Sequence, residues 1–331
     1  MTGRHPTAVT FVHGWLDSGA DELAVRLATS AAPDAVLVHP DQWAPSPPPG
    51  IEAVPTRETI GFRTAGCACC AQRVDLIDTL GRIARRRRPP SHIVVLELAG
   101  ADPATPVVTV LDDPDLTRLV RLNAVVLALD GPATATAVGT NLSPFPSEQL
   151  LEAAIMADAV WISRGRKLTP RGVQAVAAAL RGVNPLAPLD ATSEPDLAHV
   201  LGSASWSPSS VPARLRHLRL PPECGTSPPP VDGARTGSMI FSVAGALDAE
   251  RLDDWVHALH GAAGERLLRI EGVLSLAGQD RRLLVVGTRT AVRCEPGPPW
   301  RQDEPRVSWL RIAGRELELG DLGSTLLACR P

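Results

Sequence analysis

The chain has 331 residues, 44% of them hydrophobic, and at about 150 residues per domain this length predicts two domains with packed cores. Its net charge of −3 gives no reason to expect nucleic acid or an acidic membrane surface as a partner, and we expect neither. The chain begins without an apolar leader and has no run of about 18 apolar residues, so we expect a cytoplasmic protein without a membrane span.

Short apolar runs alternate with longer mixed segments through the first half of the chain. The apolar runs, which we predict to be strands buried on both faces, cover 8–12, 35–38, 93–96, 124–129 and 159–162. Helices are predicted between and after them, over 22–30, 72–88, 114–122, 147–156 and 170–182. This alternation predicts an α/β fold, in which a mainly parallel sheet carries helices on both faces and binds ligands at the carboxyl ends of its strands.

A segment rich in Ser, Pro and Gly, residues 203–237, is predicted to be a linker between a first domain (1–202) and a second (238–331). The second domain has its strands grouped, over 238–245, 266–278, 282–293 and 306–314. Its predicted helices are 248–261 and 315–329. This grouping predicts a smaller α+β domain.

The first predicted strand is followed by GWLDSGADEL, residues 14–23, which has the glycine spacing of a phosphate-binding P-loop. In such a loop, backbone N–H groups converge on phosphate at a helix N-terminus, and the next two residues are Lys and Ser or Thr. Here they are replaced by Ala and Asp, and a carboxylate about 5 Å from a phosphate oxygen costs on the order of 3 kcal/mol at an effective dielectric of about 20. The Asp either binds Mg²⁺ or favours the start of a helix. The candidate nucleotide-binding residues here are Gly14, Ser18, Gly19, Ala20 and Asp21.

Three of the six cysteines gather in GCACC, residues 66–70. In a cytoplasmic protein, cysteines favour thiols or metal ligands over disulfides. The thiolates of Cys67, Cys69 and Cys70 can converge on one soft cation, and Zn²⁺ takes four such ligands in a tetrahedron. A further side chain or water completes the site, and His39 and Asp41 after the second predicted strand are candidates. The alternative is an inert, half-buried cysteine cluster.

A carboxylate ends the third predicted strand. Glu97, followed by Gly100 and Asp102, occupies the place where P-loop proteins hold Mg²⁺ or its water, so Glu97 and Gly100 join the candidate nucleotide-binding residues. The alternative is a solvated carboxylate.

The fifth predicted strand is followed by Ser163, Arg164, Gly165 and Arg166, where P-loop GTPases read guanine with Asn-Lys-x-Asp. Arginine cannot accept a hydrogen bond, so the usual recognition of guanine is missing. The basic run 85–88 fits a helix C-terminus and does not require a nucleic-acid site.

The order of these motifs resembles the CobW family of P-loop metal-chaperone GTPases (CobW/HypB/UreG-like) over nearly the whole chain. LRGVNPLAPL (180–189) and the segments LDAERLDDWV and LLRIEGVLSLAG also resemble that family. The resemblance implies a P-loop NTPase-like first domain, a family C-terminal domain, and a GTPase that delivers a divalent metal to a client protein. Carried over by position, the three cysteines hold the metal, and the residue at 97 sits near the Mg²⁺ of the nucleotide.

Departures from the family pattern concentrate in the nucleotide site, while the cysteine motif is intact. We therefore expect a zinc-binding protein or metallochaperone with impaired or lost GTP and Mg²⁺ binding, and whether it is an enzyme stays open. One alternative is an active GTP-hydrolysing zinc chaperone in which an arginine replaces the P-loop lysine; Arg26, on the following helix, points too far along that helix. The other is a non-enzymatic partner of an active paralogue. Dimerisation is compatible with each of these.

Overall fold

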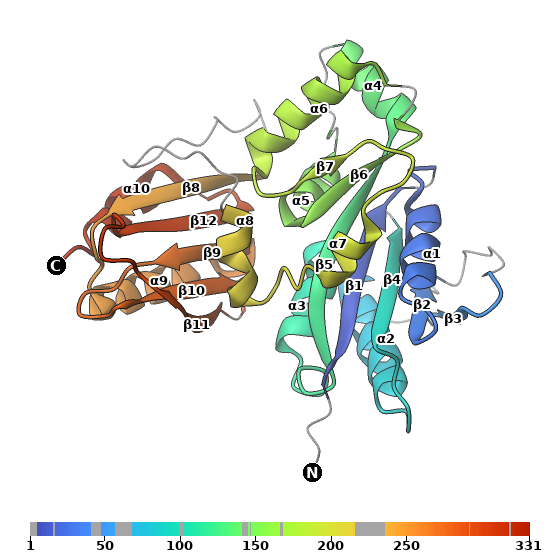
Figure 1. The fold of residues 1–331 in the computed structure, drawn as a ribbon, viewed down its shortest axis with the longest axis horizontal. Helices are drawn as coiled ribbons and strands as arrows, with labels where there is room; N and C mark the ends of the chain where they lie inside the picture. The colour runs from blue at the N-terminus through green and yellow to red at the C-terminus, as the bar shows by residue number, and fades with distance from the viewer. Residues whose placement is uncertain are drawn as a thin grey trace. The chain divides into compact units, whose positions relative to one another are not determined.

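The computed structural model describes residues 5–15, 17–40, 48–56, 68–98, 102–140, 145, 147–165, 168–215, 236–290, 292–317 and 319–331. The chain forms two compact units (Figure 1). The first comprises Met1–Leu180 and Ala187–Ala204, and the second comprises Arg181–Leu186 and Ser205–Pro331. None of the helices in the described parts of the chain is long and apolar enough to cross a membrane.

The first unit is built on a seven-stranded sheet whose strand pairs are all parallel, in the order β3-β2-β4-β1-β5-β6-β7. Its central strands are almost wholly apolar because they are buried on both faces. The strands are β1 (Thr7–Gly14), β2 (Ala35–His39), β3 (Glu52–Pro55), β4 (His92–Leu98), β5 (Val120–Asp130), β6 (Ala159–Ser163) and β7 (Leu189–Asp190). The α/β fold with a mainly parallel sheet is thereby confirmed.

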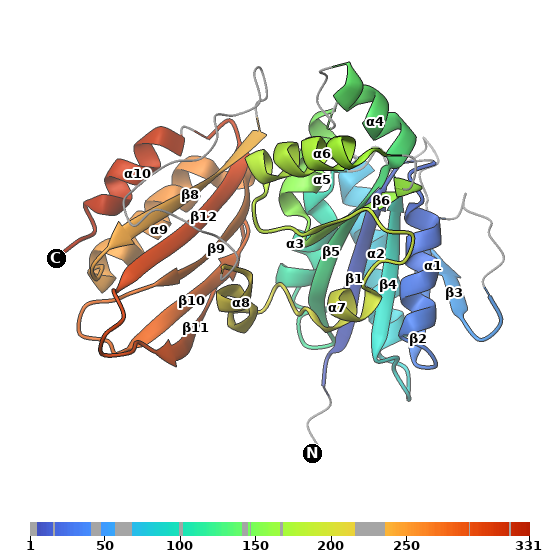
Figure 2. The ribbon, with the colours of Figure 1, turned by 45° about the horizontal axis from the view of Figure 1, so that its top comes forward.

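The direction of the crossovers decides which helix covers which face. The connection from β1 to β2 through α1 (Ala20–Ser30) moves towards the β3 edge of the sheet. The connections through α2 (Ala68–Ala84) and α3 (Ala104–Asp112) move the other way. Because such crossovers are right-handed, α2 and α3 lie on the face opposite α1, as Figures 1 and 2 show.

Strand alternation assigns side chains to these two faces. One apolar cluster joins Leu23 and Leu27 of α1 with Val12, Leu37 and Leu96 of the sheet, which defines the α1 face. Residues one position away along each strand point to the other face, which carries α2 and α3. The remaining helices of this unit are α4 (Gly131–Gly139), α5 (Glu148–Met156), α6 (Pro170–Val183, which continues into the second unit) and α7 (Leu197–Gly202).

The helix predicted over 114–122 is wrong. The structure has turns there, in which the backbone N–H of Asp115 donates to the Asp113 carboxylate at 3.0 Å, and β5 starts at Val120. The helix of this region is α3, whose run of Val and Thr argues locally against a helix. Asp102 lies just before α3 and holds its first turn, because its carboxylate accepts from the backbone N–H of Ala104 at 3.0 Å and from the Thr105 hydroxyl at 2.9 Å.

The second unit contains a five-stranded antiparallel sheet in the order β11-β10-β9-β12-β8. An apolar core joins the sheet to residues of its helices, including Trp255 and Leu326. This matches the predicted α+β unit, to which the structure adds β11. The elements are β8 (Thr236–Ala244), α9 (Ala249–Ala263), β9 (Leu267–Leu274), β10 (Arg281–Gly287), β11 (Val292–Pro299), β12 (Val307–Arg315) and α10 (Leu319–Leu327).

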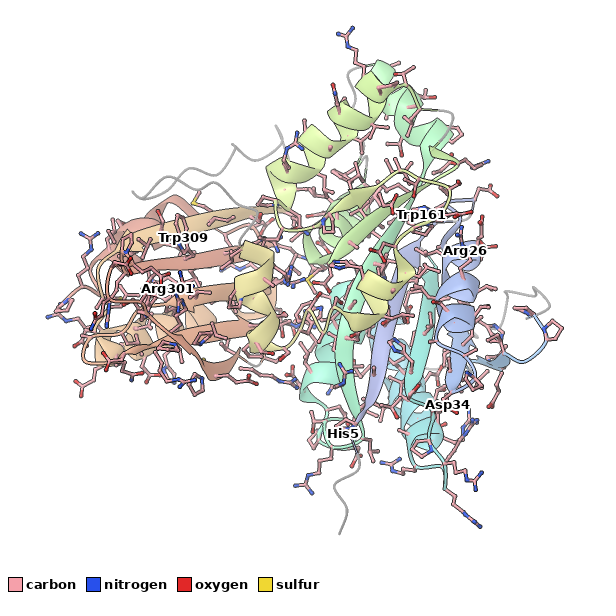
Figure 3. All side chains as sticks on the ribbon, in the orientation of Figure 1. His5, Arg26, Asp34, Trp161, Arg301 and Trp309 are labelled. Carbon is pink, nitrogen blue, oxygen red and sulfur yellow. The ribbon has the colours of Figure 1, made fainter. Side chains whose placement is uncertain are left out.

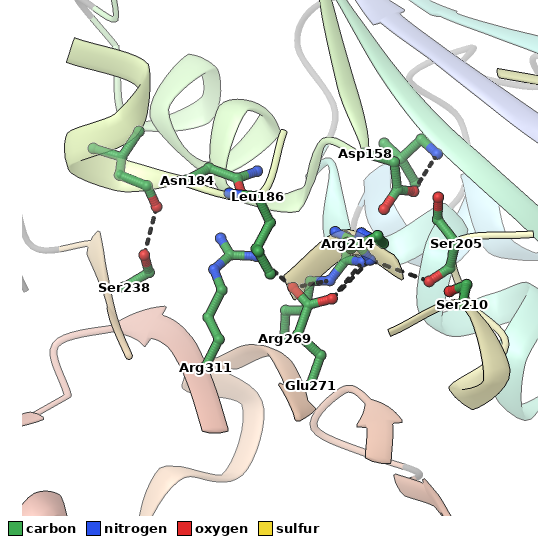
Figure 4. Close-up of polar contacts among 12 residues, drawn as sticks. Asp158, Asn184, Leu186, Ser205, Ser210, Arg214, Ser238, Arg269, Glu271 and Arg311 are labelled. Carbon is green, nitrogen blue, oxygen red and sulfur yellow. Dashed lines mark hydrogen bonds and ion pairs between the residues drawn. The ribbon is translucent and has the colours of Figure 1, made fainter. Parts of the chain in front are cut away.

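Part of the segment predicted to be a linker is folded. Residues after Ser205 belong to the second unit and form a short 3-10 helix (Pro208–Ser210) and α8 (Val211–Leu215), whereas 216–235 lie outside the described residues. Arg214 of α8 lies 2.7 Å from the Glu271 carboxylate of β9, which also pairs with Arg269 and Arg311 (Figure 4). The guanidinium of Arg269 stacks over Trp206 at 4.2 Å.

Candidate nucleotide and metal site

The loop between β1 and α1 keeps the backbone geometry that its glycines predict. Gly19 adopts a left-handed conformation, with φ of 77°, directly before the first residue of α1. A Cβ at Gly19 would lie 2.7 Å from the Cβ of Ser163, at the end of β6. A Cβ at Gly14 would overlap Ala20 and Ser18. Both positions therefore require glycine, whether or not phosphate binds.

The hydrogen bonds of this loop are made partly within the loop itself. Ser18 is buried, and its Oγ accepts from the backbone N–H of Ala20 at 3.3 Å. The N–H of Ser18 donates to the carbonyl oxygen of Trp15 at 3.0 Å. In a working P-loop, such N–H groups point at phosphate oxygens. Here the serine hydroxyl supplies one of the acceptors.

The two residues that replace Lys and Ser or Thr differ in exposure. Ala20 is 1% exposed and packs in the apolar cluster of the α1 face. Asp21 and Glu22 are exposed in the first turn of α1, where acidic side chains stabilise the positive end of the helix dipole. This position agrees with the helix-start interpretation of Asp21. Coordination of Mg²⁺ by Asp21 stays a prediction.

The arginine nearest in sequence, Arg26, is engaged elsewhere. Its Nη1 donates to the carbonyl oxygen of Ser193 at 2.7 Å, and it lies 3.5 Å from the Glu22 carboxylate. Trp161 of β6 donates from Nε1 to the neighbouring carbonyl oxygen of Thr192 at 3.0 Å. Figure 3 labels Arg26 and Trp161. These contacts fasten α1 and β6 to the segment after β7.

A different arginine stands beside the loop. Arg164 follows β6 with a left-handed φ of 52°, and its Nη2 donates to the carbonyl oxygen of Asp17 at 3.0 Å. The same guanidinium pairs with the carboxylate of Asp130 at the end of β5. A cation therefore lies at the mouth of the loop, supplied by the segment that in GTPases reads guanine. Arg166, which also belongs to this segment after β6, lies outside the described residues.

Two titratable residues are neighbours at the carboxyl ends of β1 and β4. His13 and Glu97 are register partners in these parallel strands, so both side chains lie on the face that carries α2 and α3. His13 is 5% exposed, its Nε2 is buried without a hydrogen-bond partner, and its ring stacks on Phe11 at 6.2 Å between centroids. Burial lowers the pKa of His13 to about 4, against an opposing effect of the Asp102 carboxylate.

The cysteine motif begins α2. The predicted helix started at residue 72, but α2 starts at Ala68, so Cys69 and Cys70 belong to its first turn. Cys67, Asp41 and Gly100 lie outside the described residues. His39 ends β2, with Nδ1 2.9 Å from the carbonyl oxygen of Pro40. Among the described residues alone, no three His, Cys, Asp or Glu side chains gather closely enough to hold a metal ion.

Sequence reasoning missed His13 and the position of Arg164. His13 is a single polar letter at the end of an apolar run, and nothing local distinguishes it from a core histidine. Arg164 was considered only as a failed guanine reader, because the approach of β6 to the loop is a tertiary feature.

Comparisons with known proteins place the chain in a family. Residues 54–188 match the family model described as "CobW/HypB/UreG, nucleotide-binding domain", and residues 236–330 match the "Cobalamin synthesis protein cobW C-terminal domain". A curated relative, the "Zinc chaperone CobW" of Sinorhizobium sp, is 24% identical over 285 residues, which cover 80% of this chain and 78% of that protein.

Solved structures share the fold. The Zn(II)-bound YjiA GTPase from E. coli aligns with 99% of this chain and 100% of its own, with a TM-score of 0.72 and 16% identity. A Zn(II)-bound triple mutant of YjiA GTPase aligns over the same shares with the same TM-score. The fold and both family models confirm the resemblance that the motifs indicate: this chain belongs to the CobW family, whose fold is that of a P-loop GTPase.

Proposed function

We propose that this protein binds zinc through the thiolates of Cys67, Cys69 and Cys70 and delivers it to a client metalloprotein without the usual GTP-driven cycle. The observation that supports zinc binding is the position of Cys69 and Cys70 in the first turn of the 17-residue helix α2. A helix N-terminus stabilises thiolates, which are the metal-binding form of cysteine. The name of the curated relative, a zinc chaperone, supports zinc as the metal.

Two features support the loss of ordinary nucleotide binding. The buried Ser18 hydroxyl occupies an N–H group that a phosphate would need, and Ala20 supplies no cation. The family model matches only from residue 54 onward, so the loop of residues 14–21 lies outside the matched part. The residues present therefore fit a triphosphate with Mg²⁺ poorly, and the proposed release of metal is triggered by the partner.

A second candidate function keeps the nucleotide. The guanidinium of Arg164, 3.0 Å from the Asp17 carbonyl, places a cation beside the loop that has lost its lysine. In this alternative, Arg164 contacts phosphate and the protein is an active GTP-binding zinc chaperone.

The two candidate functions are separated by calorimetric titration of the reduced, metal-free chain with GTP and Mg²⁺. The titration is made with and without one equivalent of Zn²⁺. The proposal expects no binding tighter than about 100 μM, near −5.5 kcal/mol, in either titration. Micromolar binding that disappears in Arg164→Ala would instead establish the second candidate.

Zinc binding is tested by competition with a chromogenic chelator. The double substitution Cys69→Ser and Cys70→Ser should abolish high-affinity binding while the circular dichroism spectrum stays unchanged. Cys294→Ser is the matched control, because Cys294 is a free, exposed cysteine of the second unit. Equal zinc affinity of the double variant and the control would refute the proposed binding of zinc by these cysteines.

A further inference from the structure

Arg164 holds the turn that precedes α1 through two contacts. Its Nη2 donates to the carbonyl oxygen of Asp17 at 3.0 Å, and the same guanidinium pairs with the carboxylate of Asp130. Asp130 ends β5, and Arg164 directly follows β6, its parallel neighbour. The three residues therefore meet at the carboxyl edge of the sheet.

Two of these residues have a backbone conformation that residues other than glycine rarely adopt. Asp17 has a φ of 68° and Arg164 a φ of 52°, both in the left-handed region. Such conformations persist where surrounding contacts fix them, and they are frequent at switches and ligand clamps. The hydrogen bond between Arg164 and Asp17 is a contact of this kind, because it joins the two positions.

The turn of residues 17–19 is also closed by its own groups. The backbone N–H of Ser18 donates to the carbonyl oxygen of Trp15 at 3.0 Å, and that of Ala20 donates to the Ser18 Oγ at 3.3 Å. The end of β6 packs closely against the turn, since a Cβ at Gly19 would lie 2.7 Å from the Cβ of Ser163. N–H groups and a cation that could bind a phosphate are thus occupied by the protein itself.

We propose that Asp17, Asp130 and Arg164 form an autoinhibitory latch, in which the Asp130 carboxylate competes with an external oxyanion for the guanidinium. While the latch is closed, Arg164 is held by Asp130 and keeps the turn in its closed form. An oxyanion, such as the triphosphate of a nucleotide, binds once Arg164 leaves Asp130. This inference rests on the proposed loss of ordinary nucleotide binding and names a contact that weakens such binding in addition to the missing lysine.

The chemistry and exposure of the pair suit such a competition. Carboxylate and phosphate oxygens both accept charge-assisted hydrogen bonds from the fork of a guanidinium, so one can replace the other. The side chain of Arg164 is 48% exposed and that of Asp130 is 20% exposed. An incoming anion can therefore reach the guanidinium, and a pair exposed to this extent is weak enough to open.

Asp130→Asn opens the latch and keeps the other role of this side chain. The Asp130 Oδ2 accepts from the backbone N–H of Ala133 at 3.0 Å, at the start of α4. The amide oxygen of asparagine accepts the same hydrogen bond, and asparagine is as good a helix cap as aspartate. The substitution therefore removes the charge that holds Arg164 and leaves the cap in place.

The first test is a nuclear magnetic resonance titration of the full-length protein with inorganic triphosphate, followed at the backbone amides of residues 17–22. Asp130→Asn should raise the affinity about fivefold, which corresponds to about 1 kcal/mol, the upper range for an exposed ion pair. Asp190→Asn is the matched control, because Asp190 ends β7 and its carboxylate accepts from the backbone N–H of Thr192 at 2.8 Å. It should stay within about twofold of the unchanged protein. Equal gains in both variants would overturn the inference, since the loss of any nearby negative charge would then suffice.

A double variant decides whether the gain depends on Arg164. Asp130→Asn combined with Arg164→Ala lacks the guanidinium that the first substitution releases, so its affinity for triphosphate should return to that of the unchanged protein or fall below it. A gain that persists without Arg164 would overturn the latch, because the two residues would then act independently.

Hydrogen exchange of the protein without any anion gives a second readout. Arg164→Ala should speed exchange at the amides of Ser18 and Ala20 about fivefold, because the turn loses its contact at Asp17. Arg171→Ala, at an exposed position of α6, should keep the exchange rates of the unchanged protein. Unchanged exchange at both amides in Arg164→Ala would also overturn the inference.

Failure of the latch is distinguishable from failure of the proposed function. Titration of the unchanged protein with GTP and Mg²⁺ tests the proposed loss of nucleotide binding, whereas the difference between Asp130→Asn and the unchanged protein tests the latch. Weak GTP binding without a gain in Asp130→Asn means that only the latch is wrong. Micromolar GTP binding by the unchanged protein refutes the proposed loss, and the Asp130→Asn difference still decides the latch.

Discussion

The Nη2 atom of Arg164 lies 3.0 Å from the carbonyl oxygen of Asp17, so the end of β6 is fastened directly to the loop between β1 and α1. The same side chain pairs with the Asp130 carboxylate, which caps α4 by accepting from the backbone of Ala133 at 3.0 Å. One guanidinium thus joins three segments at the carboxyl edge of the sheet.

Arg164→Ala should lower the free energy of unfolding by about 0.5–1 kcal/mol, because the pair is partly exposed to solvent. The loss should shrink in about 1 M salt, where exposed charges are screened over about 3 Å. Urea denaturation at two salt concentrations measures both effects. Arg171→Ala, at an exposed position of α6, is the control and should change little. A salt-independent loss would show that packing, not charge, holds the segments together.

Restoring the two missing P-loop residues tests whether their loss impairs nucleotide binding. Ala20→Lys combined with Asp21→Thr supplies the phosphate-binding cation and the hydroxyl that binds Mg²⁺. The affinity for GTP with Mg²⁺ should rise by at least about 10-fold, or 1.4 kcal/mol, in calorimetric titration.

The control for that restoration is Glu22→Lys, which adds a lysine at an exposed position of the same helical turn. An equal gain in this control would mean that any positive charge near the loop suffices. No gain in the double variant would place the obstacle elsewhere, with the Ser18 hydroxyl as the next group to remove.

The buried Glu271 carboxylate makes the second unit sensitive to acid. Burial alone would raise the pKa of Glu271, but Arg214, Arg269 and Arg311 outweigh it and hold the pKa at about 2. A carboxylate whose pKa is lower in the folded state than in the unfolded state stabilises the folded protein. Its contribution is complete above the ordinary pKa of 4.5 and is lost as the pH falls towards the folded-state pKa of about 2. Thermal unfolding of the second unit, measured at pH values from 5 down to 2, should show this loss, because both pKa values of Glu271 lie within this range.

Glu271→Gln should destabilise the unit by about 3–5 kcal/mol, because it leaves buried guanidinium groups without their carboxylate. The acid-dependent loss between pH 4.5 and 2 should also become smaller in this variant. Glu295→Gln, at an exposed position of β11, should keep the wild-type profile. An acid profile shared by both variants would assign the sensitivity to other groups.

Gly19→Ala should destabilise the first unit even if no nucleotide binds. A left-handed alanine costs about 1–2 kcal/mol, and its Cβ would also press on the Cβ of Ser163 at 2.7 Å. The midpoint of thermal unfolding is the measurement. Gly202→Ala, at the last residue of α7, has open space around its new Cβ and should be neutral or slightly stabilising. A stable Gly19→Ala variant would show that the loop can rearrange.

The limits of local sequence information show in particular elements. Five strands of the first unit were predicted because runs buried on both faces are continuously apolar, as in β1 and β4. The short strands β3 and β7 were missed, since neither is such a run. Helix α3 was missed because Val107, Val108 and Thr109 favour strands locally, while Asp102 and the helix packing decide otherwise. Strand β11 was missed because it contains prolines, which a sheet accepts at an edge, and β11 is an edge strand.

The sequence by itself determined the family, the α/β class and the replacement of the P-loop lysine and hydroxyl, because these depend on residue identity and spacing. Only the tertiary structure decided which side chains gather around the loop. Arg164 reaches Asp17 from a strand nearly 150 residues away in the chain. The Nε2 of His13 is buried without a hydrogen-bond partner, which the sequence around this residue does not indicate. Crossover handedness, which no single segment encodes, places α2 and α3 on the face of the sheet opposite α1 (Figures 1 and 2).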